Sequence, residues 1–309
     1  MRIAVVGAGA MGGIYGAGFT AGGNDTTLVD VALPLVEKLS AEGITIDHEG
    51  ERRIVQVHAT NDVTSVGPVD VVVFFVKCYH TTVAAEQSRP LVGDSTIVVS
   101  LQNGWGNGNE LARVFDQERI VVGVSYHSGT VLGLGSVAHT GAGPTFVGPY
   151  LGSSLDASQP VADAIRSAGF EAVVTADVRT EIWKKLTLNA AALPTAALTG
   201  LTAEAMGKPD EIVIELVDEL ARETVAVARA QGYDLDPEER VESIRAILLR
   251  AGPGKASMLQ DIEAGRRTEI DVINGAVVRA AAEHGIEVPV NRAMVALVKG
   301  YERAHGLSA

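Results

Sequence analysis

Short apolar runs, separated by polar or glycine-rich turns and helical segments, fill the first half of the chain. The run VDVVVFFVK at 69–77 is almost wholly apolar, which is typical of a parallel strand buried on both faces. Because such runs alternate with segments of helical spacing, the pattern predicts a parallel, doubly wound sheet. The other expected strands are RIAVVGA at 2–8, TTLVD at 26–30, STIVVSLQNG at 95–104, ERIVVGVSY at 118–126 and AGFEAVVTADV at 168–178.

The pattern changes in the second half of the chain. Residues 130–150 are rich in glycine and turn residues with short β stretches, which predicts hairpins appended to the sheet. From about Arg179 the apolar residues recur at helical spacing, and no convincing strand follows. We therefore expect an α/β domain over 1–177 and a second, all-helical domain over 178–309. Four glycines stand where these helices should end: Gly232, Gly252, Gly285 and Gly306.

A glycine motif, GAGAMG, directly follows the first predicted strand and opens the first predicted helix. Gly7 allows a tight turn, Gly9 lets a pyrophosphate approach the backbone, and Gly12 lets the helix pack on the strand. The N–H groups at the helix start, at Ala10 and Met11, attract phosphate together with the helix dipole. A plain glycine-rich turn is the alternative, but this position favours a Rossmann-like dinucleotide-binding domain.

Asp30 ends the second predicted strand, about 20 residues beyond the glycine motif. A carboxylate at that position accepts hydrogen bonds from the adenosine ribose and repels the 2′-phosphate of NADP. No arginine lies beside it, and the nearest base, Lys38, lies well into the next predicted helix. We therefore expect NAD(H) to be favoured over NADP(H). The alternative is an aspartate that only forms the turn before that helix.

Lys77 and Asn103 each follow a buried strand at its carboxyl end. In an open α/β sheet, ligands lie outside these ends, so this lysine and this amide could hold the nicotinamide ribose. A lysine that extends out of the core and an Asn-Gly turn explain the same residues without a cofactor.

The stretch EIWKKLTLNAAAL at 181–193 carries a candidate proton donor. Lys185 and Asn189 are four residues apart and share a helical face with apolar neighbours. Burial on such a face lowers the pKa of a lysine, which suits proton transfer. Lys184 points elsewhere on the helix and is expected to be solvated. A structural salt bridge is the alternative for Lys185.

The stretch ASMLQDIEAGRRTEIDVING supplies Ser257 and Glu269 as further candidates. Gly265 is expected to end one helix, and Thr268 with Asp271 is typical of a capping box that starts the next. Glu269 would then lie in a first helical turn. Its alternative role is to complement the helix dipole.

Composition and charge narrow the class of protein. The 309 residues are enough for about two domains, and 47% apolar against 20% charged residues favour an ordered core. The net charge of −13 argues against nucleic acid and anionic membranes as partners. The single cysteine, Cys78, excludes a disulfide framework and fits a reducing cytoplasm, and no secretory signal is visible. No metal site is expected.

Together these motifs resemble the ketopantoate reductase (2-dehydropantoate 2-reductase) family over nearly the whole chain. The resemblance implies an enzyme of pantothenate biosynthesis that transfers hydride from NAD(P)H to the C2 carbonyl of a 2-oxo acid, in a cleft between two domains. We also expect a homodimer, with the helical domain serving substrate binding and dimerisation. The shared stretches are GAGAMG, the strand ending in Lys77, QNG at 102–104, HTGAG at 139–143, WKKLTLN at 183–189 and SMLQDIEAGRRTEIDVING at 257–275.

The resemblance also implies individual roles. Lys185 matches the catalytic lysine and Glu269 the active-site carboxylate of the family. Asn103, Asn189 and Ser257 match positions that hold cofactor or substrate.

The chain departs from the family pattern at two positions near the matched lysine. Leu193 and Ala203 stand where the family commonly has asparagines, one of which touches the substrate. The pocket is therefore expected to be more apolar than in a pantoate-forming enzyme. An NAD-dependent D-2-hydroxy acid dehydrogenase is the first alternative function. A non-catalytic dinucleotide sensor is the second, although a sensor needs neither Lys185 nor Glu269.

Overall fold

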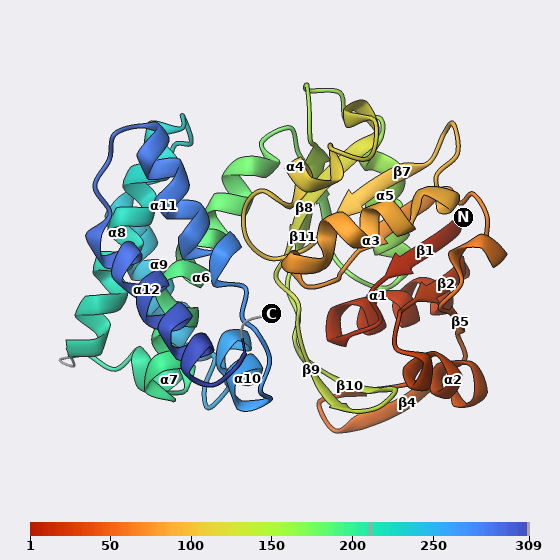
Figure 1. Ribbon diagram of the computed structural model, residues 1–309, viewed down its shortest axis with the longest axis horizontal. Helices are drawn as coiled ribbons and strands as arrows, with labels where there is room; N and C mark the ends of the chain where they lie inside the picture. Colours follow the sequence, from red (N-terminus) through yellow and green to blue (C-terminus); the bar gives the residue numbers. More distant parts are fainter. Residues whose placement is uncertain (210–211, 308–309) are drawn as a thin grey trace. The chain divides into compact units, whose positions relative to one another are not determined.

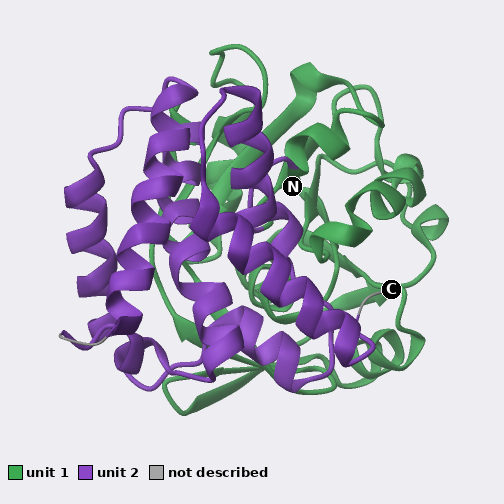
Figure 2. Cartoon of the chain, turned by 60° about the vertical axis from the view of Figure 1, so that its left-hand side comes forward, with its two compact units in different colours: residues 1–102, 107–178 green, residues 103–106, 179–309 purple. Residues whose placement is uncertain are grey.

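The computed structural model of the chain, which describes residues 1–209 and 212–307, divides into two compact units (Figures 1 and 2). Asn103–Gly106 belongs by its contacts to the second unit, although it follows a strand of the first unit. Asn103 is thereby grouped with the helical residues. The first unit comprises 1–102 and 107–178, and the second comprises 103–106 and 179–309.

An eight-stranded sheet in the order β12-β11-β8-β7-β6-β1-β2-β5 forms the centre of the first unit. All neighbouring pairs are parallel except β11 with β8. The chain passes from β1 to β2 and then crosses to β6 on the other side of β1, so the predicted doubly wound α/β fold is confirmed. The strands are β1 (Arg2–Val6), β2 (Asp25–Val29), β5 (His58–Thr60), β6 (Val71–Phe74), β7 (Ile97–Ser100), β8 (Ile120–Ser125), β11 (Thr145–Pro149) and β12 (Ala172–Val174).

Short helices connect these strands. Helix α1 is buried from Gly12 to Phe19, and its many small residues let it lie close to the strands. The helices of the first unit are α1 (Ala10–Ala21), α2 (Leu33–Glu42), α3 (Thr81–Gln87), α4 (Asn107–Leu111) and α5 (Ser158–Ser167), with the 3-10 turns η1 (Val63–Ser65), η2 (Cys78–His80), η3 (Arg89–Leu91) and η4 (Gln117–Arg119).

A separate four-stranded sheet, in the order β4-β3-β10-β9, also belongs to the first unit. Its strands are β3 (Ile44–His48), β4 (Glu51–Val55), β9 (Ser128–Gly133) and β10 (Ser136–Gly141). The prediction that the glycine-rich hairpins extend the main sheet is wrong for β9 and β10, and holds only for β11. The alternation of buried Ile44 and Ile46 with polar neighbours creates an apolar face on β3, which Val137 of β10 shares. The sequence pattern does not predict β3, β4 or the short edge strand β5 of the main sheet.

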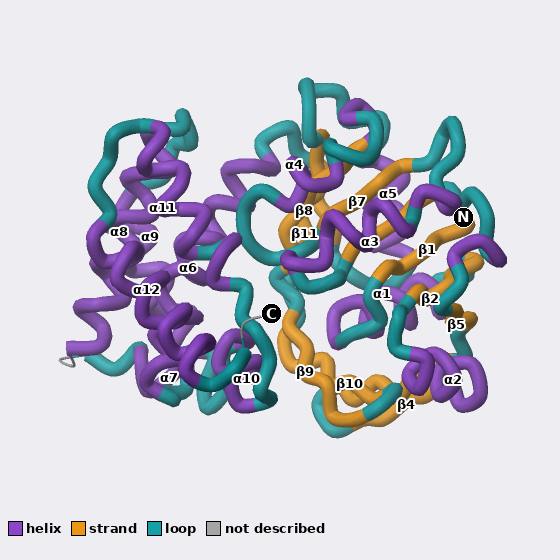
Figure 3. Tube along the Cα trace, in the orientation of Figure 1, coloured by secondary structure: helices purple, strands orange, loops and turns teal. Residues whose placement is uncertain are grey.

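Residues 179–209 and 212–307 of the second unit form helices joined by loops, with no strand among them, as predicted (Figure 3). At the start of α9, the Asp236 carboxylate accepts the N–H of Glu239 at 2.8 Å, and Pro237 occupies the first turn. Within the described residues, no helix is long and apolar enough to cross a membrane. The helices are α6 (Val178–Thr199), α7 (Ala203–Met206), α8 (Ile212–Ala230), α9 (Pro237–Arg250), α10 (Ser257–Glu263), α11 (Asn274–Glu283) and α12 (Pro289–Ala304), with the 3-10 turn η5 (Ile270–Val272).

Candidate active site

The glycine motif forms the turn from β1 to α1, and its three glycines do different things. Gly7 has a φ of +96°, which favours glycine, and a Cβ there would lie 2.8 Å from the Val76 nitrogen. A Cβ on Gly12 would lie only 1.8 Å from the Gly7 carbonyl oxygen. At Gly9, in contrast, a Cβ would meet no atom within 4 Å. The exposed, open side of the turn is therefore at Gly9, the N-cap residue of α1.

The start of α1 fits the phosphates of a dinucleotide. Ala10 and Met11 are its first helical residues, and N–H groups in a first turn have no acceptor inside the helix. The first turn contains no acidic residue that would repel an anion. These N–H groups and the positive end of the helix dipole can therefore hold a pyrophosphate that approaches over Gly9.

Asp30 lies beside the same loop and braces it. Its Oδ2 accepts the N–H of Ala8 at 2.8 Å, and its Oδ1 accepts the N–H of Ala32 at 2.9 Å. Val6 pairs with Val29, so the carboxyl ends of β1 and β2 lie at one edge of the sheet. The Asp30 carboxylate thus ties the end of β2 to the glycine loop, a role that the sequence did not predict.

Lys77 lies at that same edge, just before η2 in the loop that follows β6. Phe74 pairs with Ser100, so the loops after β6 and β7 are neighbours. Gln102 joins them, because its Nε2 donates to the Val76 carbonyl and to the Thr81 hydroxyl, both at 2.8 Å. Gln102 therefore fixes the loop that carries Lys77. The sequence interpretation gave this glutamine no role, although its place in the QNG stretch was a signal.

Lys185 interacts with both Asn103 and Glu269 in the second unit. The Lys185 Nζ donates to the Asn103 Oδ1 at 2.9 Å, so residues far apart in the sequence meet. Burial lowers the pKa of Lys185 to about 8, while the charge of Glu269 raises it. A lysine with this pKa is mostly protonated at neutral pH and gives up its proton readily. The group is therefore suited to general acid and base chemistry.

Helix α6 carries several of the candidate residues on one face. Asn189 lies one turn after Lys185 and is buried, and Leu193 lies a further turn on. Leu193 packs against the apolar cluster around Trp183. Lys184 instead forms an ion pair with Glu181 at 2.7 Å. Lys184, which was expected to be solvated, is therefore paired within its own helix.

The Glu269 segment differs from the sequence prediction in one respect. The Thr268 N–H and hydroxyl both donate to Oε1 of Glu302, at 2.7 and 2.6 Å, and the Asp271 carboxylate pairs with Lys299 at 2.5 Å. The predicted capping box is therefore wrong, because Glu269 rather than Thr268 is the N-cap, the Thr268 hydroxyl oxygen accepts the Ile270 N–H at 3.3 Å, and the Asp271 carboxylate pairs with Lys299. Glu269 is the buried N-cap residue of the 3-10 turn η5 rather than part of a first helical turn.

Ser257 stands apart from this group. It is the first residue of α10 and its side chain is exposed. Its placement within the described residues adds no hydrogen bond to the cluster around Lys185.

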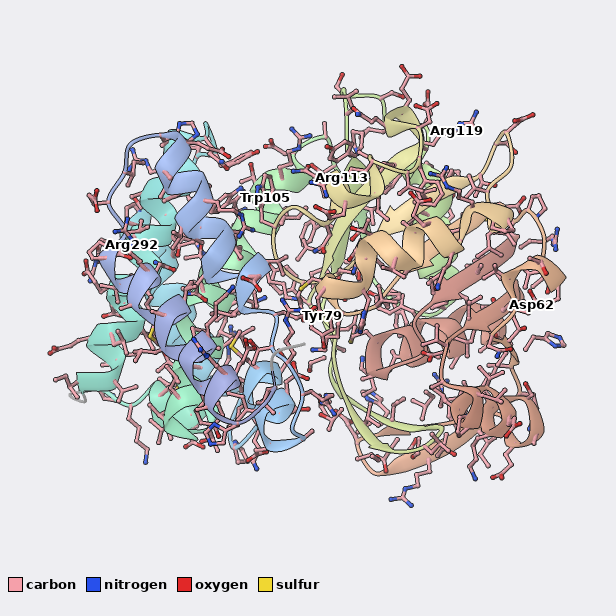
Figure 4. The ribbon with its side chains drawn as sticks, in the orientation of Figure 1. Asp62, Tyr79, Trp105, Arg113, Arg119 and Arg292 are labelled. Carbon is pink, nitrogen blue, oxygen red and sulfur yellow. The ribbon has the colours of Figure 1, made fainter. Side chains whose placement is uncertain are left out.

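An aromatic group that the sequence interpretation missed stands next to the candidate residues. The ring of Trp105 lies 5.3 Å from that of Trp183 and 5.9 Å from that of Tyr233 (Trp105 is labelled in Figure 4). The Trp105 N–H also donates to the Val272 carbonyl at 2.8 Å. Since Trp105 and Trp183 each lie two residues from a candidate side chain, these contacts hold the Asn103 segment against α6 and η5.

A cavity of about 610 Å³ lies elsewhere in the first unit and contains none of the candidate residues. Its lining includes His48, His127 and His139, the last from the HTGAG stretch. Burial, and then the charge of His48, lower the pKa of His139. Within the described residues, no group of three or more His, Cys, Asp or Glu side chains is placed to hold a metal ion.

Comparisons with known proteins agree over nearly the whole chain. Residues 3–152 match the family model of ketopantoate reductase PanE/ApbA, and residues 177–302 match the model of its C-terminal part. The 2-dehydropantoate 2-reductase of Halobacterium salinarum is 32% identical, covering 98% of this chain and 99% of the relative. That of Archaeoglobus fulgidus is 31% identical, covering 97% and 98%.

Solved structures show the same similarity. The 2-dehydropantoate 2-reductase of Geobacter metallireducens superposes with a TM-score of 0.92 at 29% identity, covering 97% of this chain and 99% of that one. A D-mandelate dehydrogenase in complex with NADH and anilino(oxo)acetate gives a TM-score of 0.94 at 24% identity over 100% of both chains. At that identity the second likeness shows the fold alone.

Proposed function

Because this chain belongs to the ketopantoate reductase family, we propose that it reduces the C2 carbonyl of a small 2-oxo acid with NAD(P)H. The substrate would be 2-dehydropantoate or a close analogue. The observation that carries the proposal is the Lys185 ammonium, hydrogen-bonded to Asn103 and acted on by the charge of Glu269. The Lys185 ammonium can interact with a small anionic substrate, which gives this buried cation a function beyond a structural one.

In the proposed mechanism the chain's own residues stabilise the negative charge on the substrate oxygen and supply the proton. The bound nicotinamide supplies the hydride that reduces C2. As negative charge develops on the carbonyl oxygen, Lys185 stabilises it and donates a proton to form the hydroxyl. Asn103 orients the ammonium, and the Glu269 carboxylate keeps it protonated despite burial. Asn189 and Ser257 are assigned to the substrate's carboxylate or a hydroxyl.

A spectrophotometric panel tests this function. NADH and NADPH are offered with 2-dehydropantoate and with 2-oxo acids that carry branched or aromatic side chains, and oxidation of the cofactor is followed. We expect turnover with at least one of these acids. Cofactor binding without any turnover would instead favour the dinucleotide sensor.

The cofactor preference is a separate part of the proposal. NADH is expected to bind more tightly than NADPH, because the Asp30 carboxylate would repel a 2′-phosphate at the adenosine ribose. The nearest lysine in α2, Lys38, is paired with Glu42 at 2.5 Å. Asp30→Asn should narrow the ratio of the two dissociation constants by about tenfold. Isothermal titration calorimetry measures both constants.

Asp30→Ala serves as the comparison for Asp30→Asn. Asparagine keeps one acceptor oxygen, whereas Asp30→Ala removes the charge and both acceptors for the Ala8 and Ala32 N–H groups, so both cofactors should bind more weakly to it than to Asp30→Asn. Tighter binding of NADPH than NADH by the unmodified protein would contradict the assigned preference.

The substrate side chain is expected to be apolar. Leu193 and Ala203 each pack in an apolar cluster, so neither position offers a hydrogen bond to a substrate hydroxyl. Relative kcat/KM should therefore favour branched or bulky apolar 2-oxo acids over 2-dehydropantoate. Leu193→Asn should shift this ratio toward 2-dehydropantoate by about tenfold, the value of one hydrogen bond. Efficient turnover of 2-dehydropantoate alone by the unmodified protein would contradict this prediction.

A homodimer in the cytoplasm completes the proposal. Size-exclusion chromatography with light scattering would test the dimer.

A further inference from the structure

Helix α6 lacks one backbone hydrogen bond just beyond the candidate catalytic residues. Pro194 lies inside the helix and has no N–H, so it cannot donate to the carbonyl of Ala190, four residues earlier. Ala190 is fully buried and follows Asn189 directly. A buried carbonyl without a donor costs about 1–3 kcal/mol, so the fold must supply a donor from elsewhere.

Asn274 supplies that donor. Its Nδ2 donates to the Ala190 carbonyl at 2.9 Å and to the Asn291 Oδ1, also at 2.9 Å. The Nδ2 of Asn291 in turn donates to Oε2 of Glu223 at 2.8 Å. The side chains of Asn274 and Asn291 are wholly buried, and Glu223 is nearly so. A chain of hydrogen bonds therefore runs from α6 through α11 and α12 to a carboxylate on α8.

The orientation of the Asn274 amide follows from its neighbours. The Ala190 carbonyl can only accept, and Asn291 must turn its NH₂ toward Glu223, so Asn274 faces two acceptors. In this orientation the Oδ1 of Asn274 has no hydrogen-bond partner within the described residues. Asn274 thus leaves a buried acceptor, its own Oδ1, unsatisfied. This indicates that the position requires the two N–H donors of its Nδ2.

The same residue follows the candidate carboxylate closely along the chain, five positions after Glu269 and just beyond the 3-10 turn η5. Glu269 opens η5, its carbonyl accepts the Val272 N–H at 3.1 Å, and Asn274 follows this turn as the first residue of α11. Lys185 lies on α6, N-terminal to Ala190. The bond from Asn274 to Ala190 thus connects the segment that carries Glu269 to the helix that carries Lys185.

We propose that Asn274 is a positioning residue, which uses the carbonyl freed by Pro194 to hold Glu269 at its working distance from Lys185. The proposal rests on the catalytic role proposed above for these two residues. Its test does not, because the titration of Lys185 can be followed without turnover.

The direct test follows the pKa of Lys185 in Asn274→Ala. The pH dependence of Lys185 modification by trinitrobenzenesulfonate is read by peptide mass spectrometry, with Lys184 as internal reference. Because Glu269 raises the pKa of Lys185, a released Glu269 should let it fall below about 8, by several tenths of a unit to about one unit. In a Glu269→Gln background, Asn274→Ala should cause no further fall.

A second substitution separates the positioning of Glu269 from the need of the Ala190 carbonyl for a donor. Pro194→Ala restores an N–H to the Ala190 carbonyl, so Asn274→Ala should lower the urea midpoint much less in that background. The fall in the pKa of Lys185, measured against Pro194→Ala alone, should persist. This pair of variants also decides the question if Asn274→Ala alone fails to fold.

Thr195→Val is the matched control. Thr195 is also wholly buried on α6, and its hydroxyl bonds to Ala191 within the same helix at 2.8 Å. It should lower the urea midpoint and leave the titration of Lys185 unchanged. An unchanged titration in Asn274→Ala, or one restored by Pro194→Ala, would overturn the positioning role.

Discussion

Lys185→Met is expected to lower kcat for 2-oxo acid reduction by roughly 10²–10⁴-fold, the usual contribution of a general acid. Methionine keeps most of the apolar stem but cannot stabilise the developing alkoxide or donate a proton. The dissociation constant of NADH should change little, because the glycine loop that fits the pyrophosphate lies on a different part of the chain. Stopped-flow measurement of a single turnover, with calorimetry for NADH, checks both expectations.

The same substitution should not destabilise the protein at neutral pH. Burial lowers the pKa of Lys185 from its ordinary 10.5 to about 8, so between these values the unfolded chain binds more protons than the folded one. The free energy of unfolding therefore rises with pH between about 8 and 10.5. Below pH 8, the protonated lysine lowers this free energy by the full amount. At pH 7, Lys185→Met should match or exceed the unmodified protein in its urea midpoint.

Lys184→Met is the control for both measurements. Its ammonium pairs with Glu181, so its loss should change kcat less than threefold and stability by at most about 1 kcal/mol. Equal, small effects of the two substitutions on kcat would remove Lys185 from the mechanism. A large loss of stability in Lys185→Met with kcat preserved would identify Lys185 as a structural ion-pair partner.

Gly9→Ala is expected to weaken the binding of both NADH and NADPH by about 10- to 100-fold without changing the fold. The backbone at Gly9 is extended, with φ −69° and ψ −158°, outside the left-handed region that favours glycine, and a Cβ there meets no protein atom within 4 Å. The methyl group would therefore occupy only the space through which the pyrophosphate approaches. Calorimetry measures the affinities, and circular dichroism with thermal unfolding checks the fold.

Gly133→Ala provides the comparison for Gly9→Ala. A Cβ at Gly133 also meets nothing within 4 Å, but this residue is the last of β9 and not part of the glycine loop. It should leave both the affinity for NADH and the thermal stability unchanged. Unaltered NADH binding by Gly9→Ala would contradict the placement of the pyrophosphate over this turn.

Local patterns were enough to predict the helical unit and the main sheet except for its short edge strand β5. The apolar run that contains β6 and the helical spacing after Arg179 each reflect burial along a single element, which the sequence records directly. The strands β3 and β4 were not predicted, because two half-buried strands joined by a polar turn give a weaker signal. The place of β9 and β10 depended on β3 and was therefore also missed.

The candidate site shows a similar division. The spacing of Lys185 and Asn189 on one helix predicts a shared face, but the bond from Lys185 to Asn103 joins residues 82 positions apart. No local pattern encodes such a pair, and only the family resemblance placed both residues in one site. The role of Asn274 depends on a carbonyl that Pro194 leaves open in another helix. Pro194 itself was the visible signal that some donor had to be found.

The pH dependence of kcat/KM for 2-oxo acid reduction tests most directly whether Lys185 donates the proton. If the protonated lysine is required, kcat/KM should be level below about pH 8 and fall tenfold per unit above it. Oxidation of the corresponding 2-hydroxy acid should show the opposite dependence, because it needs the neutral amine. Coincidence of both midpoints with the titration of Lys185 by chemical modification would support the assignment. A reduction rate that stays level from pH 7 to pH 10, while Lys185 titrates near 8, would contradict it.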